Sequence, residues 1–184
     1  MEKEHTDITI RPATEADYEE LKELFAQGAD IHHAGEPGII GGSSERPVTS
    51  RWFSRLLRNP ANGVLVAELP DAQPGGWRIA GFTHLVFQDV TGIPGLVPRR
   101  YVLVVDIEVR PSAQGRGIGH RLMSATEAWA TSRGATQIEL SVWEFNSRAR
   151  ALYEELGYRT IYRQLLKEIS PPTTGTYKDQ GEHR

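Results

Sequence analysis

The chain has 184 residues, 39% of them hydrophobic, and a formal net charge of −3. This length suits one domain with a substantial core, and the slightly acidic charge argues against a dedicated nucleic-acid-binding protein. The absence of cysteine excludes disulfides, cysteine-ligated zinc and a thiol nucleophile. A polar N-terminus and the lack of a long apolar run predict a soluble, cytoplasmic protein with no membrane partner.

Turn residues and apolar spacing divide the chain into strands and helices. Thr14 with Asp17 three residues later resembles a capping box, and Gly28 and Gly134 follow apolar stripes of helical spacing. Residues 100–110 are rich in β-branched side chains and too apolar for an edge, which predicts a central strand. In chain order, the expected elements are a strand at 7–11, a helix from 14 to about 28, an irregular loop at 32–47, a helix at 49–58, strands at 63–69, 77–87 and 100–110, a helix at 117–133, a strand at 137–143, a helix at 146–157 and a strand region at 158–169.

This order predicts one mixed α/β domain over residues 1–170. A helix at 117–133 then bridges one parallel pair of strands. Residues 171–184 are polar and rich in Pro, Thr and Gly, so we expect a disordered tail there.

The strongest local signal is Gln-Gly-Arg-Gly-Ile-Gly at residues 114–119, between an expected strand and an expected helix. The glycines let the backbone approach a ligand closely, and the N–H groups of the first helical turn favour an anion. Arg116 adds a positive charge. The run lacks the ending of a P-loop, and His120 stands where a dinucleotide fingerprint has its third glycine, although Glu139 lies about twenty residues on. A tight turn without a ligand is the alternative.

Two motifs carry a resemblance to a known family. The run from Gln114 to Gly119 reads Gln-x-x-Gly-x-Gly and resembles the acyl-CoA signature of the GNAT N-acetyltransferase superfamily. Residues 142–158 resemble that family's second cofactor motif, in which an asparagine, here Asn146, precedes Leu-Tyr and Leu-Gly-aromatic. The resemblance spans residues 99–169. It implies a mostly antiparallel central sheet with a V-shaped splay between the fourth and fifth strands and helices on both faces.

The resemblance also implies acetyl-CoA as the acyl-donor cosubstrate, lying in the splay. Its pantetheine amides would pair with the strand edge at 106–109, with a β-bulge near Ile107 or Val109. Its pyrophosphate would lie on the N–H groups of the glycine-rich turn, with Arg121 either helping to hold it or remaining a surface charge. The expected cofactor-binding residues are Ile107, Val109, Gln114, Gly115, Arg116, Gly117, Ile118, Gly119, His120, Asn146 and Tyr153.

Asp106 and Glu108 are the candidate bases. They lie two residues apart on a strand and therefore share a face. Two carboxylates beside the acetyl group would bind a cationic amine, raise each other's pKa and accept the proton of the amine. The alternative is structural ion pairing with Arg99, Arg100 or Arg110.

Tyr153 is the candidate acid, because the resemblance places it beside the thioester sulfur, where it would protonate the departing thiolate; a buried core tyrosine is the alternative. The Val109 N–H would meet the oxyanion that forms during attack. We further expect His32, His33 and Trp143, together with Asp106, to border the acceptor pocket.

The sequence therefore predicts an acetyl-CoA-dependent N-acetyltransferase that needs no metal and forms no acyl-enzyme. The acceptor would be a primary amine of a small cationic molecule or of a peptide, and the family suggests a homodimer. Two alternatives are a non-catalytic acyl-CoA-binding or regulatory module and a nucleotide-binding oxidoreductase domain.

Overall fold

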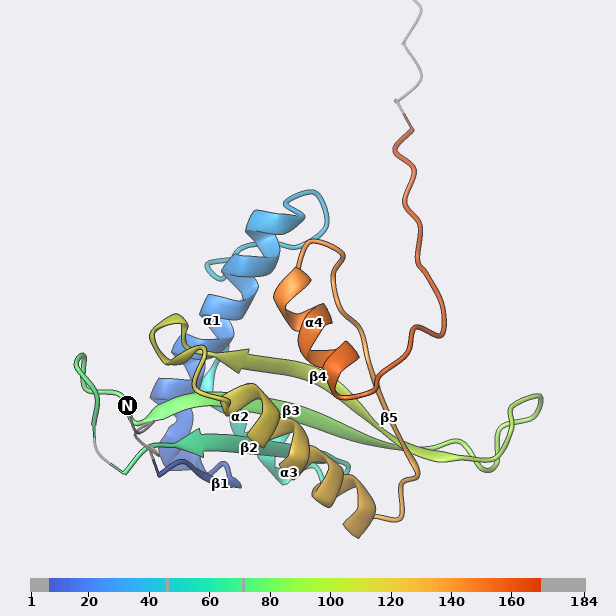
Figure 1. Cartoon of the computed structure of the whole chain (residues 1–184), viewed down its shortest axis with the longest axis horizontal. Helices are drawn as coiled ribbons and strands as arrows, with labels where there is room; N and C mark the ends of the chain where they lie inside the picture. Colours follow the sequence, from blue (N-terminus) through green and yellow to red (C-terminus); the bar gives the residue numbers. More distant parts are fainter. Residues whose placement is uncertain (1–6, 46, 71, 170–184) are drawn as a thin grey trace, which may run out of the picture.

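The computed structural model describes residues 7–45, 47–70 and 72–169 (Figure 1). Its first part contains β1 (Thr9–Pro12), a 3₁₀ turn (Glu15–Asp17), α1 (Tyr18–Gly35), α2 (Ser50–Arg58), β2 (Asn62–Glu68) and β3 (Ile79–Asp89). Its second part contains β4 (Arg100–Val109), a 3₁₀ turn (Pro111–Ala113), α3 (Ile118–Ser132), β5 (Gln137–Leu140) and α4 (Ser147–Glu155).

The five strands form one sheet in the order β1-β2-β3-β4-β5. The first three pairs are antiparallel, and β4 and β5 are parallel because α3 carries the chain back across the sheet between them. The expected mixed, mostly antiparallel sheet is confirmed.

Strand β5 ends about halfway along β4, and the second half of β4 has no partner on that side. Only Tyr101–Val104 of β4 pairs with Gln137–Leu140 of β5, whereas β4 continues to Val109. A bulge opposite His84 and Leu85 makes Val105 the extra residue of β4. The predicted splay is present, and β4 has a bulge as expected, at Val105, two residues before the predicted neighbourhood of Ile107. The bulge lies where β5 ends, because that is where β4 turns away.

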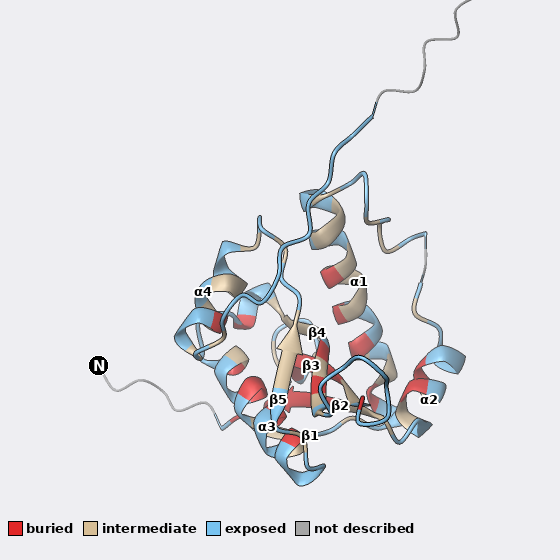
Figure 2. Ribbon diagram, turned by 90° about the vertical axis from the view of Figure 1, so that its right-hand side faces the viewer, coloured by how far each residue is buried: buried red, intermediate tan, exposed pale blue. Residues whose placement is uncertain are grey.

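Helices cover both faces of the sheet, with α1 and α2 on one side and α3 and α4 on the other (Figure 2). The core on the α1–α2 side contains Leu21, Leu24, Phe53, Leu56, Val64, Val66, Ile79 and Phe82. The core on the α3–α4 side contains two buried clusters, which include Ala67, Leu69, Ile118, Leu122, Leu85, Val102, Val104, Met123 and Tyr153.

Helix α1 runs seven residues past Gly28, so the prediction that it ends there was wrong. Gly28 is instead where α1 crosses β4. A Cβ atom at this position would lie 2.5 Å from Oε1 of Glu108, so any other residue would require the carboxylate to move away from the helix. His32 and His33 consequently lie on the last turns of the helix and not in a loop.

The C-terminal region contains a second departure from expectation. Residues 158–169 form no strand, although the sequence predicts one. A strand needs a pairing partner, and this segment extends away from the sheet of its own chain (Figure 1). The predicted tail at 171–184 lies outside the described residues. No helix in the described ranges is long and apolar enough to cross a membrane.

Candidate active site

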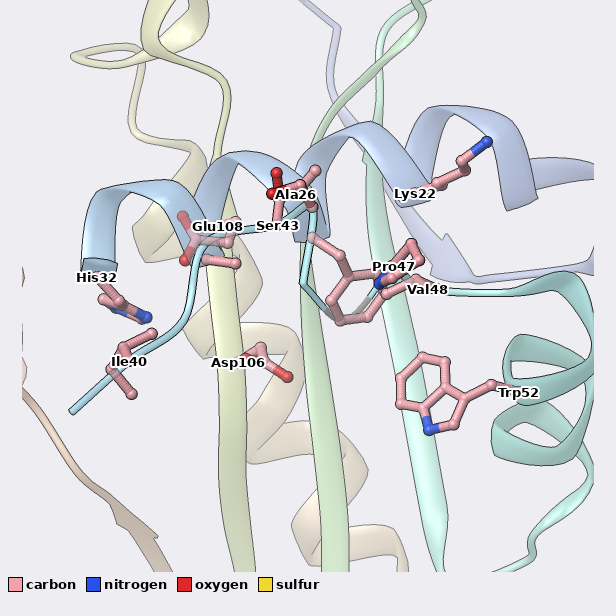
Figure 3. Close-up of a pocket in the computed structure, with 14 residues that line it drawn as sticks. Lys22, Ala26, His32, Ile40, Ser43, Pro47, Val48, Trp52, Asp106 and Glu108 are labelled. Atoms are coloured by element: carbon pink, nitrogen blue, oxygen red, sulfur yellow. The ribbon is translucent and has the colours of Figure 1, made fainter. Parts of the chain in front are cut away.

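Asp106 and Glu108 lie on the same face of β4, under α1. They form one wall of a cavity of about 390 Å³ that is closed by α1, the loop after it and the start of α2 (Figure 3). The cavity is lined by Lys22, Phe25, Ala26, Gly28, Ala29, His32, Ile40, Ser43, Ser44, Pro47, Val48, Trp52, Asp106 and Glu108. Its volume suits a small ligand, and its walls are mostly apolar.

Glu108 has a carboxyl group whose pKa differs strongly from its ordinary value. Burial, followed by the negative charge of Asp106, raises its pKa from the ordinary 4.5 to about 7. A carboxylate with such a pKa is half ionised at neutral pH. It can therefore accept a proton and release it again, as a general base must.

Asp106 has a partner that sequence reasoning missed. His84 lies directly opposite it on β3, with its Nδ1 3.3 Å from Oδ2 of Asp106. The imidazole is buried, and its Nε2 has no hydrogen-bond partner among the residues that the structure describes. The only signal available in the sequence was a single histidine within a largely apolar strand.

The alternative role of the two carboxylates, ion pairing with neighbouring arginines, is wrong. Each of the three arginines is engaged elsewhere: Arg99 with Glu139, Arg100 with Asp89, and Arg110 with Glu20 and Glu23. The carboxylates are thus left facing the cavity.

Tyr153 approaches the same region from α4. It is 7% exposed and packs in the α3–α4 core, with its ring centre 5.7 Å from that of Tyr158. Burial raises the pKa of Tyr153 to about 12, with smaller contributions from the charges of Glu108 and Tyr158. The phenol therefore stays protonated at neutral pH. The negative charge of Glu108 contributes to this shift in the Tyr153 pKa, so the carboxyl group and the phenol interact electrostatically.

The glycine-rich turn has the geometry of an anion cradle. Gly115 and Gly117 have φ angles of 80° and 76°, and Gly117 is the N-cap of α3. A Cβ atom at either glycine would meet nothing within 4 Å, so the space above the turn is open. The N–H groups at the start of α3 face this space without intrahelical partners.

Other residues near the turn divide between backbone and side-chain roles. Ile118 is buried, so only its backbone can serve a ligand, and a Cβ atom at Gly119 would lie 3.1 Å from Leu152. The His120 ring lies 3.3 Å from the Glu155 carboxylate, and the Arg121 side chain donates to the Ile8 carbonyl at 3.2 Å. Arg116 is exposed at the turn.

The free edge of β4 points into the splay. The Arg110 N–H donates to the Ala80 carbonyl on β3. Because successive residues of a strand alternate in direction, the backbone groups of Val109 and Ile107 face the opposite edge. The Val109 carbonyl already accepts a hydrogen bond from the Gln114 side chain there, at 3.2 Å. The Val109 N–H is therefore available to a ligand.

The family model for the acetyltransferase (GNAT) family matches residues 20–158. This chain belongs to the GNAT acetyltransferase family. The GNAT chain is 27% identical over 158 residues to a thialysine N-epsilon-acetyltransferase of Sus scrofa, an alignment that covers 84% of this chain and 85% of that protein. It is 44% identical over 169 residues to the mycothiol acetyltransferase of Beutenbergia cavernae, covering 77% of this chain and 56% of the relative.

Structural comparison agrees. A crystal structure of a mutant BH1408 protein from Bacillus halodurans matches this GNAT chain with a TM-score of 0.78 at 25% identity, covering 88% of this chain and 99% of that one. The family and its named relatives make the protein an acyltransferase that performs acyl-CoA-dependent N-acetyl transfer. They exclude the non-catalytic module and the oxidoreductase domain.

The remaining expected residues of this acetyltransferase fall into two groups. Asn146 caps α4 by accepting the Ala149 N–H at 3.1 Å, and His32 lines the cavity. The Trp143 ring lies tilted beside His32, with ring centres 6.4 Å apart, but it does not line the cavity. The His33 ring hydrogen-bonds the Ile40 carbonyl at 2.6 Å. The cavity is therefore walled in part by residues that sequence reasoning left unassigned, notably Lys22, Phe25 and Val48. No cluster of three or more potential metal ligands is found in the described part of the chain.

Proposed function

We propose that this protein transfers an acetyl group from acetyl-CoA directly to the primary amine of a small cationic molecule. The observation that carries the proposal is the pairing of Glu108, whose pKa is about 7, with Tyr153, whose pKa is about 12, within electrostatic range of each other. Two groups whose environments separate their pKa values in this way suit the base and the acid of one reaction.

Acetyl-CoA fits the residues present. The open cradle at Gly115 and Gly117 and the start of α3 would hold its pyrophosphate. The free edge of β4 at Ile107 and Val109 would pair with its pantetheine amides as an added strand would. Bound there, the cosubstrate supplies an acyl group already activated as a thioester.

Glu108 would act as the general base. An alkylamine with an ordinary pKa of about 10.4 is almost wholly protonated at pH 7, so a proton must leave before nitrogen can attack. Asp106 would attract the ammonium group, and Glu108 would accept its proton directly or through one water. The nitrogen would then attack the thioester carbon, and the Val109 N–H would donate to the oxyanion that forms. The C–S bond would break as the carbonyl group reforms, and the second proton of the nitrogen would leave to water and so restore the proton that Tyr153 gives up.

Tyr153 would donate its proton to the departing sulfur. Transfer from a phenol of pKa about 12 to a thiolate of ordinary pKa about 8.5 costs about 5 kcal/mol. Turnover of about 10 per second corresponds to a barrier of about 16 kcal/mol, so this cost does not prevent the role. His84 would hold the Asp106 carboxylate in place.

The cavity favours a small acceptor. Its volume of about 390 Å³, its two carboxylates at one wall and its apolar side chains, including Trp52, suit a cation with an aliphatic body. The similarity to a thialysine N-epsilon-acetyltransferase supports a lysine-like amine. A peptide amine is the second candidate, and the exposed rim at Trp52 favours it because a longer chain could cross there.

The test is CoA release on a panel of amines, with acetyl-CoA binding measured separately by calorimetry and NAD as the negative control. The panel contains lysine-like amino acids, polyamines, aminoglycosides and lysine-containing peptides. We expect acetyl-CoA to bind in the micromolar range and turnover to be confined to one class. Acetyl-CoA binding without turnover on any amine would contradict the assigned acceptor class, and failure to bind would contradict the cradle.

A further inference from the structure

A buried histidine beside the site has one ring nitrogen without a partner. His84 is 7% exposed, and its Nε2 is enclosed with no hydrogen-bond partner among the residues that the structure describes. Its neighbours on this face of the sheet are apolar, with Val64 opposite it on β2 and Phe82 two residues away on β3. An unsatisfied buried polar atom lowers stability, and a leucine of similar volume would avoid that loss. A histidine at this position therefore has a reason other than packing.

The other ring nitrogen supplies that reason, because it contacts Asp106. The Nδ1 atom lies 3.3 Å from Oδ2 of Asp106, the residue directly opposite on β4. A carboxylate only accepts hydrogen bonds, so the ring must carry a proton on Nδ1 to bind it. In the neutral ring Nε2 then keeps its lone pair, buried and without a partner. The unsatisfied nitrogen is thus a consequence of the contact with Asp106.

Asp106 is held at its backbone as well. Thr83, the neighbour of His84, is fully buried and donates its hydroxyl hydrogen to the Asp106 carbonyl at 3.0 Å. Asp106 follows directly after the bulge at Val105, and a bulge turns the side chains beside it in a new direction. Two consecutive residues of β3 therefore hold the backbone and the carboxylate of Asp106 where β4 is irregular. We term Thr83 and His84 the β3 clamp.

The two carboxylates of the cavity differ in what holds them. Figure 3 shows the Asp106 carboxylate turned towards β3 and the Glu108 carboxylate on the other side of β4, where His32 lies. Glu108 has no hydrogen-bond or ion-pair partner in the described part of the chain. A carboxylate fixed by a donor suits the attraction of a cation, whereas one without a partner can take up a proton without breaking a contact.

We propose that the β3 clamp makes Asp106 a fixed anchor for the ammonium group of the acceptor and so leaves Glu108 as the base. This inference rests on the proposed function and deepens it, because it says what separates the roles of two like carboxylates two residues apart. His84 does not line the cavity and acts through Asp106, so it is a positioning residue. The clamp matters for cationic acceptors alone, since an uncharged acceptor offers the anchor no charge to attract.

The first test needs no turnover. The nitrogen resonances of the histidine rings, recorded by NMR on an isotopically labelled chain, show which ring nitrogen carries a proton. The spectrum of His84→Asn, which lacks one ring, identifies the signals of His84. We expect a proton on Nδ1 of His84. A proton on Nε2 alone would mean that the ring does not donate to Asp106, and it would overturn the proposal.

The second test compares acceptors of different charge. His84→Leu removes the donor and keeps the volume, whereas His84→Asn places an amide N–H close to where Nδ1 lies. For a cationic alkylamine we expect His84→Leu to raise KM about tenfold while kcat stays within about twofold, and His84→Asn to recover most of the loss. Thr83→Val, which removes only the backbone contact, should raise KM about threefold. For an alkoxyamine of the same length, which is uncharged at neutral pH, KM should not change.

The results separate the clamp from the fold and from the proposed function. Melting temperature and acetyl-CoA affinity, measured for each variant, show whether it is folded. If folded His84→Leu loses the same factor on both acceptors, or nothing on the cationic one, His84 does not position an anchor and the proposal is wrong. If the natural chain acetylates neither acceptor, the proposed function fails and the anchor fails with it.

Discussion

Replacing Glu108 with glutamine should make the protein more stable and less active at the same time. The amide keeps the size of the side chain but cannot ionise, so it avoids the burial of a charge that raises the pKa of Glu108 to about 7. Displacing a pKa from 4.5 to about 7 corresponds to about 3 kcal/mol. Discounting this value for the partial solvent contact of the side chain leaves about 1.5 to 3 kcal/mol.

The sign follows from which state holds the proton. Below pH 4.5 the carboxyl group is protonated in both the folded and the unfolded chain, so it causes no loss of folding stability there. Between pH 4.5 and 7 the unfolded chain loses this proton first, and the natural protein is destabilised as pH rises. The glutamine variant escapes this loss. We therefore expect its melting temperature to exceed that of the natural protein by about 4 to 10 °C at pH 8, and by far less at pH 5.

Thermal unfolding and kinetics at pH 5 to 9 measure both effects. In the natural protein kcat/KM should fall about tenfold per pH unit below pH 7, whereas Glu108→Gln should be about 10² to 10⁴ times slower at pH 8 and lack this dependence. The control is Glu154→Gln on the exposed surface of α4, which should change neither quantity. A melting-temperature difference that is the same at pH 5 and pH 8 would refute the raised pKa, and undiminished activity would refute the role as base.

Three further substitutions test the other parts of the site. Tyr153→Phe should lower kcat about 10²-fold while leaving acetyl-CoA affinity nearly intact, and a wild-type kcat would remove Tyr153 from the acid role. Gly117→Val should weaken acetyl-CoA binding at least tenfold, because the side chain would fill the cradle. Gly134→Val is the control, since its φ of 73° brings comparable backbone strain, and it should leave the affinity unchanged. Equal affinities of the two variants in a calorimetric titration would contradict the cradle. Gly28→Ala would place a Cβ atom 2.5 Å from Oε1 of Glu108 and displace that carboxylate. We therefore expect kcat/KM to fall 10- to 100-fold with little loss of stability. Unchanged kinetics would show that the position of Glu108 does not limit the reaction.

Local patterns predicted most of the elements because each one depends on neighbouring residues. The capping box of Thr14 and Asp17 is present, and Gly134 follows the end of α3 with φ 73°. The alternation of strand side chains placed Asp106 and Glu108 on one face. The turn at Gly115 and Gly117 has the positive φ angles that its glycines suggested.

Contacts between distant residues could not be predicted in the same way. Gly28 resembled a helix end, but it serves the crossing of α1 over β4, which depends on a residue eighty positions away. His84 gave no motif, and only the register of β3 against β4 brings it to Asp106. The cavity walls at Phe25 and Val48 depend on how α1 and the following loop close over the sheet.

The sequence by itself determined the family, the strand and helix order and the glycine turn, because these follow from short-range spacing and backbone preference. Only the tertiary structure decided the pKa of Glu108, since burial and the charge of Asp106 act through space. It also decided the fate of residues 158–169. Their β-forming pattern is local, but pairing requires an edge. In the described part of the chain the edge strands are β1 and β5, and residues 158–169 extend away from the sheet.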